Sequence, residues 1–241
     1  MVENKTSGCF ICGKDIQYFP AAKSMPCGVC GQNFETDAAC LDEHFVCNDC
    51  HAQKGLATIT YYAQNSLSKN PINISIEMMK SPSINMHGPE HHFLVPAALL
   101  TAYKNAGADI DLNESLAAAK QRAKNVPGGI CGMWGSCGAA IGTGIFVSVA
   151  TKATPLSEKE WRLANLMTSK SLNDISENGG PRCCKRDSWL AILQAIDFAD
   201  EHLGVRMEKP ERIQCEFHAE NKNCRQEKCL FYLGFVLNSR A

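Results

Sequence analysis

Eight residues arranged as four short pairs of metal ligands lie in the first fifty positions of the chain. Reading along the sequence, the pairs are Cys9 and Cys12, Cys27 and Cys30, Cys40 and His44, and Cys47 and Cys50. Two or three residues between the members of a pair let both side chains reach one ion, and tetrahedral zinc takes four such ligands. The spacing therefore predicts a module over residues 1–52 that holds two zinc ions and depends on them for most of its folding energy.

The order of the pairs resembles that of cross-brace zinc modules, in which alternate pairs share an ion. This order predicts one ion on Cys9, Cys12, Cys40 and His44, and a second on Cys27, Cys30, Cys47 and Cys50. Sequential pairing is the alternative arrangement, His51 is either spare or a substitute for His44, and iron in an all-thiolate site is the rival metal. A closed set of four ligands leaves no open position, so we expect a structural or protein-binding module rather than a catalytic one.

Composition excludes several classes of protein. The chain has 24 basic and 25 acidic residues, a balance without the positive surface of a general nucleic-acid-binding protein. The N-terminus lacks the apolar segment of a signal peptide, and the longest apolar run, residues 138–150, is shorter than the roughly 20 residues of a membrane span. We therefore expect a cytoplasmic protein without membrane contact, where cysteine pairs bind metal more often than they form disulfides.

The rest of the chain is predicted to be mainly α-helical. Helices are expected over 70–80 and 89–105, from 113 to the stop at Pro127, over 138–151, from a capping box at Ser157 to about 175, and over 183–203. Pro96 predicts a kink, and the small residues of 138–151 predict close packing on another helix or a cofactor. Four regions follow: a treble-clef or cross-brace-like zinc module (1–52), a connector with a short helix (53–84), a helical domain with a Cys/His site (85–209), and a short Cys-rich extended tail (210–241).

Three histidines surround the predicted start of the second helix, in the segment Met86-His87-Gly88-Pro89-Glu90-His91-His92. The letters match the HxxEH pattern of inverted zinc proteases, but Gly-Pro places the helix start after His87, so the two histidines do not share one helical face. We expect instead a site for a metal or an anion at the helix start, with His87 and His91 as its candidates. The alternative is that these histidines cap the helix or pack in the core.

Two glycine-rich turns each present two cysteines at the start of a helix. The first carries Cys131 and Cys137, and the second carries Cys183 and Cys184 beside Arg182, Lys185 and Arg186. The helix dipole and these cations predict lowered thiol pKa values, and Arg182 and Lys185 are expected to hold an anionic substrate or a thiolate. Such thiolates could ligate an iron–sulfur cluster, act as a redox dithiol or attack a substrate, whereas the alternative is that they pack as small apolar residues.

The tail contains a further constellation of ligands, Cys215-x2-His218-x5-Cys224-x4-Cys229. These residues could close a third metal site. The three thiolates could equally hold an iron–sulfur cluster, with the fourth iron open or ligated by a cysteine of the helical domain. Since vicinal cysteines seldom bind one tetrahedral ion together, we expect only one of Cys183 and Cys184 to face the site at the glycine-rich turns.

These motifs carry a resemblance to known families. The CxxC module, MHGPEHH, GGxCGxWGxCGAAIGTG, GGPRCCKR and the segment from Cys215 to Cys229 resemble an uncharacterised Cys-rich family of anaerobic bacteria and archaea, sometimes fused to methyltransferase or radical-SAM domains. The Gly-rich segment is also distantly similar to a redox-active family named for its C…GCAxxG…C…C pattern. The resemblance implies redox or sulfur-related work with a protein partner: an electron or sulfur donor, a methyltransferase or a radical-SAM protein.

The candidate function is therefore a metal-binding redox or sulfur-handling protein, with a structural zinc module and a Cys/His centre in the helical domain. Catalytic roles are assigned to Cys131, Cys137, Cys183, His87 and Arg182, and cofactor binding to Cys184, Cys215, Cys224, Cys229 and His91. The alternative is a non-enzymatic adaptor or metallochaperone whose zinc module binds a protein. Whether the chain is an enzyme, which substrate it takes and its oligomeric state are left open.

Overall fold

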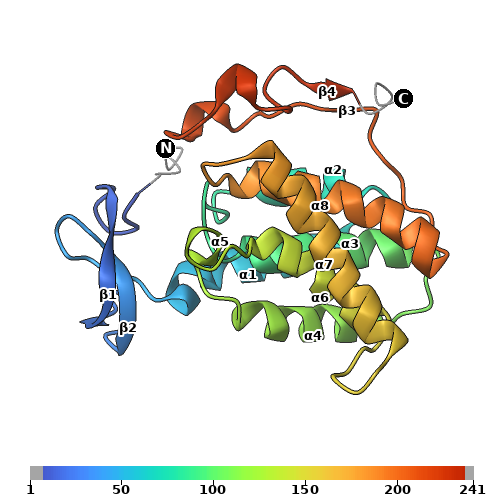
Figure 1. The fold of residues 1–241 in the computed structure, drawn as a ribbon, viewed down its shortest axis with the longest axis horizontal. Coiled ribbons are helices and arrows are strands. Elements are labelled where there is room, and N and C mark those ends of the chain that lie inside the picture. The colour runs from blue at the N-terminus through green and yellow to red at the C-terminus, as the bar shows by residue number, and fades with distance from the viewer. Residues whose placement is uncertain (1–7, 237–241) are drawn as a thin grey trace.

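The protein is a bundle of α-helices with a small two-stranded module at its N-terminal end and a loop-rich tail along one side (Figure 1). The computed structural model describes residues 8–236. This architecture confirms the predicted mainly α class. None of the helices in the described part is both long and apolar enough to cross a membrane.

The N-terminal module contains an antiparallel hairpin of β1 (Ile16–Pro26) and β2 (Asn33–Cys40). A break in register between Tyr18 and Lys23 bends β1 against its partner. Strand β1 is mostly exposed, whereas β2 is half-buried and becomes buried at its end, at Ala39 and Cys40. Helix α1 (Asn48–Asn65) starts inside the module and runs across the predicted boundary at residue 52 into the helical bundle.

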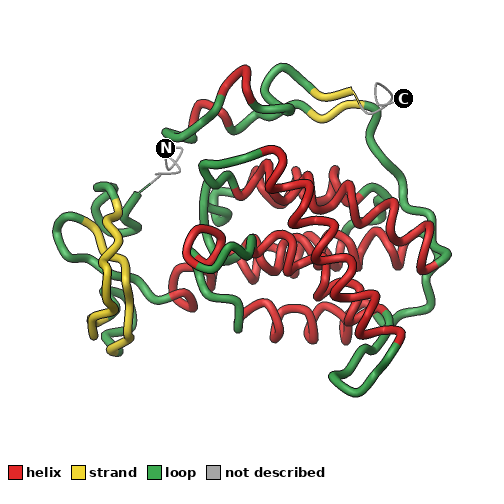
Figure 2. Tube along the Cα trace, viewed as in Figure 1, coloured by secondary structure: helices red, strands yellow, loops and turns green. Residues whose placement is uncertain are grey.

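The helical bundle is built around α3 (His91–Asn105), which is buried along most of its length. Its neighbours are α1, α2 (Pro71–Lys80), α4 (Leu112–Lys124), α6 (Gly138–Ala150) and α8 (Cys184–Phe198), while α7 (Lys159–Asn178) covers α6 and α8. Figure 2 shows these helices as one cluster, with the hairpin outside it. The core is continuous across the helices, and Phe93, Phe146 and Trp189 are among its largest buried side chains.

Small residues on α6 allow close packing against two helices, as predicted. A Cβ atom added to Gly142 would lie 3.0 Å from the Pro96 ring of α3, and one added to Gly144 would clash with Thr168 of α7. The ring of Pro96, the predicted kink position, therefore packs into a space that glycine leaves open, while α3 continues on both sides of it.

Several helix ends differ from the expectation. Asn70 caps α2 as predicted, its Oδ1 accepting from the amides of Ile72 and Asn73. The capping box at Ser157 is wrong, because the Ser157 hydroxyl is engaged with Thr154 and α7 begins at Lys159. The predicted helix over 183–203 is α8 followed by a π-helical turn, Ala199–Leu203.

The tail has less extended structure than expected. Its strands are β3 (Arg212–Ile213) and β4 (Phe235–Val236), which pair with each other, and short 3₁₀ turns at His218–Glu220 and Gln226–Lys228 lie between them. A four-residue helix, α5 (Ile130–Met133), lies in the first glycine-rich turn, where no helix was predicted. Phe217 and Phe231 of the tail pack on Trp189 of α8, which fastens the tail to the bundle.

Candidate functional site

The N-terminal module brings its eight predicted ligands into two groups. Within each group the candidate ligand atoms all lie within 4.8 Å of one another, and the groups are Cys9, Cys12, Cys40 and His44, and Cys27, Cys30, Cys47 and Cys50. These are the crossed sets, not the sequential ones. The Sγ atoms of Cys12 and Cys40 are 3.8 Å apart, which matches the roughly 3.8 Å between two sulfurs that share a tetrahedral ion with bonds of about 2.3 Å.

The two CxxC turns have the same backbone. Gly13 and Gly31 both have a φ of +73°, a left-handed conformation that favours glycine, and the amides of Ile11 and Val29 donate to the sulfurs of Cys9 and Cys27. Burial alone would raise the pKa of Cys27, but backbone N–H groups lower it to about 6. A thiol that deprotonates easily, such as that of Cys27, favours metal binding in the second group, because metal ions bind the thiolate form.

His44 completes the first group. Its Nδ1 atom is buried and has no hydrogen-bond partner among the described residues. A buried nitrogen without a partner costs free energy unless something else binds it. Together with the short distances, this atom indicates that both groups could hold a metal ion. His51 belongs to neither group.

A cleft with a volume of about 2080 Å³ lies between the module and the helical bundle. One wall comes from the module and includes Phe10 and Phe34. The other wall comes from three segments of the helical domain and includes His87, His91, His92, Cys131, Cys137, Arg182, Cys184 and Asp187. The structure thus brings the MHGPEHH segment and both glycine-rich turns to one site, as the sequence predicted for these segments.

The thiols at the starts of the two helices α6 and α8 are not the thiolates that their helix-terminal positions predicted. Burial and the Asp187 carboxylate raise the pKa of Cys137 to about 12, and burial also raises the pKa of Cys183 and Cys184. Burial disfavours the charged form more than the helix dipole and the flanking cations favour it. The prediction of lowered thiol pKa values is therefore wrong for these three cysteines.

Asp187 is a site residue that the sequence analysis missed. Its Oδ2 atom lies 3.9 Å from the Sγ of Cys137 and accepts a hydrogen bond from the amide of Cys183, while its Oδ1 accepts from Arg186. It connects the two glycine-rich turns and is buried at their junction. The available signal was its position four residues after Cys183, on the helix that the second turn opens.

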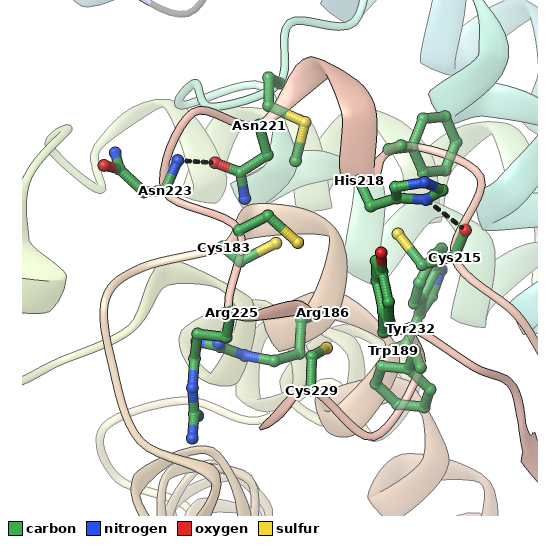
Figure 3. Close-up of a pocket in the computed structure, with 14 residues that line it drawn as sticks. Cys183, Arg186, Trp189, Cys215, His218, Asn221, Asn223, Arg225, Cys229 and Tyr232 are labelled. Atoms are coloured by element: carbon green, nitrogen blue, oxygen red, sulfur yellow. Dashed lines mark hydrogen bonds between the residues drawn. The ribbon is translucent and has the colours of Figure 1, made fainter. Parts of the chain in front are cut away.

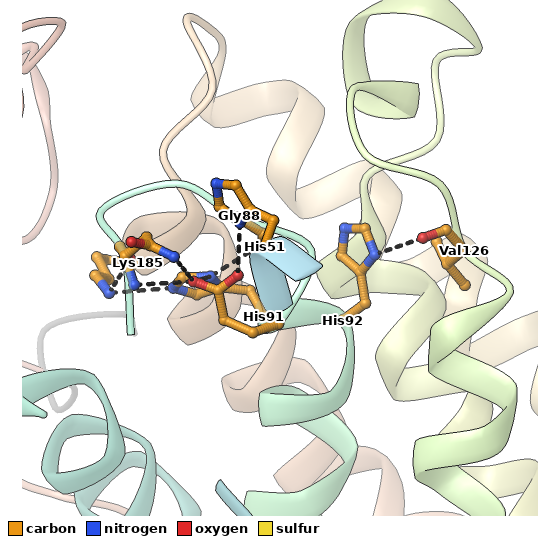
Figure 4. Close-up of polar contacts among 8 residues, drawn as sticks. His51, Gly88, His91, His92, Val126 and Lys185 are labelled. Carbon is orange, nitrogen blue, oxygen red and sulfur yellow. Dashed lines mark hydrogen bonds and ion pairs between the residues drawn. The ribbon is translucent and has the colours of Figure 1, made fainter. Parts of the chain in front are cut away.

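A buried polar network lies behind the histidine wall of the cleft (Figure 4). Lys185 donates to the carbonyl of Asn85 at 2.9 Å and to Nε2 of His91 at 3.1 Å, and the other ring nitrogen of His91 donates to the Gly88 carbonyl. His91 is therefore the neutral Nδ1–H tautomer with its Nε2 atom engaged. Lys185 is fully buried, so the expectation that it holds an anionic substrate is wrong.

Glu90 connects this network to the module. Its carboxylate is fully buried, accepts from the amide of Asn85 and lies 3.7 Å from Nδ1 of His51. The His51 ring in turn packs on Phe10. His51, spare as a metal ligand, thus contacts the helical domain at the first turns of α1.

His87 and His92 complete the histidine wall. His87 Nε2 lies 3.4 Å from the Asn221 side chain of the tail. His92 Nδ1 lies 3.0 Å from the Val126 carbonyl; this contact is drawn in Figure 4. The ring of His92 packs against Gly138, where any side chain would clash with it. Burial and then the Arg182 charge lower the pKa of His87 to about 4.

The lowered pKa of His87 predicts that the folded protein loses stability in mild acid. A histidine whose folded-state pKa lies below its ordinary value of 6.5 leaves the folded protein with fewer protons than the unfolded chain between those two pH values. Stability from His87 is therefore complete above pH 6.5 and falls as the pH drops towards 4, by about 2 to 3 kcal/mol. Urea unfolding at several pH values measures this loss, and His87→Gln should be less pH-dependent than the wild type over that window. If the free energy of unfolding changed with pH in the same way in both proteins, this prediction would be contradicted.

The four cysteines of the two glycine-rich turns divide between two places. Cys131, Cys137 and Cys184 line the cleft, whereas Cys183 lines a separate pocket with the tail residues Cys215, His218, Cys224 and Cys229. Compared with the sequence assignment, Cys183 and Cys184 have exchanged places. Cys184, the first residue of α8, lines the cleft, and Cys183, which precedes the helix, lines the tail pocket. His91 lines the cleft and not the tail pocket.

The fold and these sites define a mainly α-helical, cysteine-rich protein with two candidate metal sites in an N-terminal module. A family model described as a family of unknown function, DUF5714, matches residues 59–232. The chain belongs to this family. The match includes the cleft residues of the helical domain and the tail cysteines but begins after the metal module. No curated protein and no solved structure matches the chain.

Proposed function

We propose that the protein is a thiol-dependent redox or sulfur-handling protein whose working site is the cleft, with the N-terminal module as a zinc-bound wall. One observation carries the proposal: the cleft gathers Cys131, Cys137, His87 and Arg182 from three separate segments of the helical domain. The resemblance of the first glycine-rich segment to a redox-active family, and of the chain to proteins of anaerobes, supports the same chemistry.

The two thiols of the first glycine-rich turn differ in the way that a two-step exchange requires. Cys131 is partly exposed in the short helix α5, and Cys137 lies close enough to interact with it electrostatically. Cys137 is held by Asp187 and has a raised pKa, which makes it a poor first nucleophile at neutral pH. Cys131 is therefore the attacking thiol and Cys137 the resolving one.

The proposed exchange reduces a disulfide bound in the cleft. The Cys131 thiolate attacks one sulfur of that disulfide, and the other sulfur leaves as a thiol, so a mixed disulfide forms. Cys137 then attacks Cys131, the second half of the substrate leaves as a thiol, and Cys131 and Cys137 are joined. Two electrons and two protons pass from the protein to the substrate, and a partner that donates electrons restores the thiols.

Arg182 gives this site a preference for anionic substrates. Its side chain is exposed at the cleft, and its charge affects His87 and Cys184.

The N-terminal module forms the opposite wall of the cleft. Each of its two candidate metal sites has four ligands, which suits structural zinc more than a catalytic ion with an open position. The redox partner is a protein electron or sulfur donor, with a methyltransferase or radical-SAM protein as the candidates that the family resemblance implies.

A single tryptic peptide tests the exchange. Residues 125–152 contain Cys131 and Cys137 and no other cysteine. After incubation with glutathione disulfide, an anionic probe, this wild-type peptide should carry an internal disulfide and no glutathione. Cys137→Ser should stop at one glutathione on Cys131, because the resolving thiol is absent. In Cys131→Ser, the remaining thiol of the peptide should react with glutathione disulfide at least about tenfold more slowly than the wild-type peptide does.

Ser136→Ala is the matched control for these variants, because it changes a neighbouring residue of the same turn without removing a thiol. Its tryptic peptide should form the internal disulfide as the wild-type peptide does. A wild-type peptide that forms neither the internal disulfide nor a mixed one would contradict the proposal. That outcome favours the adaptor function, which the exposed side chains of Val29 and Leu41 on the module support as a contact surface for a protein.

A further inference from the structure

A second cluster of cysteines lies outside the cleft, where the tail crosses the start of α8 (Figure 3). Cys183 comes from the helical domain, and the tail contributes Cys215, Cys224 and Cys229. Cys215 lies close enough to the other three to interact with each of them electrostatically. All four are free thiols, so the cluster is not a pair of disulfides.

Ordinary core packing does not explain this arrangement. Each of the four cysteines retains some solvent exposure, whereas cysteines that pack as small apolar residues are typically fully buried. The aromatic side chains of Trp189, Phe217 and Phe231 pack beside the pocket and fill the core there. One thiol at the start of α8 and three from the tail, 32 or more residues further along the chain, therefore line one partly open pocket.

The backbone around the tail cysteines resembles that of the two N-terminal ligand turns. The amide of Gln226 donates to the sulfur of Cys224 at 3.3 Å, two residues along the chain. The same contact joins Ile11 to Cys9 and Val29 to Cys27. The backbone amide of Phe217 also hydrogen-bonds the sulfur of Cys215, again two residues along. Amides directed at sulfur stabilise metal-bound thiolates.

A left-handed residue accompanies one of these turns. Gln226 has a φ of +50°, which is unfavourable for a side chain of this kind, and it follows Cys224 by two residues. The residue in this conformation is the one whose amide donates to the sulfur of Cys224. Strain of this kind persists where the surrounding site requires it.

We propose that Cys183, Cys215, Cys224 and Cys229 bind a third metal centre, which joins the tail to the helical domain. Four thiolates select zinc, iron or an iron–sulfur cluster over hard cations such as magnesium. The pocket between these side chains has a volume of about 20 Å³. The four sulfurs are not gathered as tightly as the two N-terminal groups, whose ligand atoms all lie within 4.8 Å of one another, so the thiols would draw together to share a single ion. The centre is independent of the cleft chemistry, because it uses none of the thiols that the redox proposal needs.

The tail already contacts the helical domain at this place, which gives the centre a role. The Arg225 guanidinium donates to the carbonyls of Asn178 and Gly179 at the end of α7, and the rings of Phe217 and Phe231 pack on Trp189 of α8. A metal on Cys183 would add a bond between the tail and the start of α8, next to Cys184 in the cleft wall.

Metal content tests the proposal. The full chain, purified without oxygen, should contain metal beyond the two ions of the N-terminal module: a third zinc or iron, or iron with an equivalent amount of acid-labile sulfide. Cys215→Ser and Cys224→Ser should lose this additional metal and retain the other two ions. Cys184→Ser, the matched control one position from Cys183, should retain all of it.

Two further measurements keep the result interpretable. The two ions that remain in each variant, together with an unchanged far-ultraviolet circular dichroism spectrum, show that it has folded. Wild-type protein reconstituted with zinc, or with ferrous iron and sulfide, guards against loss of the metal during purification. Two ions per chain in the wild type after both reconstitutions, or a third ion that Cys215→Ser and Cys224→Ser both retain, would overturn the proposal.

Discussion

Cys27→Ser is expected to release the metal of the second ligand group and to unfold the N-terminal module while the helical domain remains folded. The buried apolar side chains of the described module are four ligand cysteines, Cys9, Cys27, Cys40 and Cys47, and two alanines, Ala39 and Ala52. Its core therefore consists mainly of the two candidate metal sites. Structural zinc contributes about 10–16 kcal/mol to comparable small modules, which is far more than two buried alanines can replace.

Limited proteolysis with metal analysis measures this effect. The variant should contain at least one metal ion less than the wild type and should be cut within residues 8–47 at a protease concentration that leaves the wild type intact. Treating the wild type with a zinc chelator should produce the same cuts. Cys131→Ser, which removes a thiol outside the module, is the control. A module that resists protease equally well after chelation would show that metal does not hold it together.

Unfolding the module should also alter the cleft, because one wall of the cleft belongs to it. The contact between His51 and Glu90, at 3.7 Å, and the packing of Phe10 on His51 both depend on the first turns of α1 and the first ligand turn. A chelated protein is thus expected to expose Cys137 to alkylation, although the cysteine lies in another segment. Removal of metal from the N-terminal module should therefore affect the cleft through this wall.

The sequence predicted the metal module well because ligand spacing is a local property. A CxxC turn with a following glycine has few backbone conformations, and the same φ at Gly13 and Gly31 is the result. The crossed pairing followed from the order of the four pairs. Helix starts set by a single side chain, such as Asn70, were predictable for the same reason.

Burial was not predictable from local pattern, and it decided the character of the cleft. The sequence placed Cys137, Cys183 and Cys184 at helix starts, where a dipole lowers a thiol pKa, but tertiary packing raised it instead. The same limit applied to Lys185, whose position beside two arginines indicated a surface cation. Which of two vicinal cysteines faces which pocket depends on the rotation of α8 against the bundle, and no motif encodes that rotation.

Lys185→Met is expected to lower the stability of the helical domain by about 3 kcal/mol, although methionine nearly matches lysine in length. The ammonium group donates to the Asn85 carbonyl and to His91 Nε2, and hydrogen bonds to a charged group contribute about 1.5–3 kcal/mol each to stability. Methionine avoids the cost of burying a charge but leaves both acceptors without this donor in a buried site. For a chain of this size the change corresponds to a fall of roughly 6–12 °C in Tm.

Whether Lys185→Met lowers or raises the Tm distinguishes a stabilising role of the buried ammonium group from a functional role that costs stability. Thermal unfolding followed by circular dichroism should give a lower Tm for Lys185→Met, and Lys80→Met, on the exposed face of α2, should stay close to the wild type because surface ion pairs contribute little. An increased Tm for Lys185→Met would contradict the structural role. It would mean that burial of the ammonium group lowers the stability of the fold, as is typical of groups with a functional role. Lys185 would then be expected to act on the site next to it, at His91.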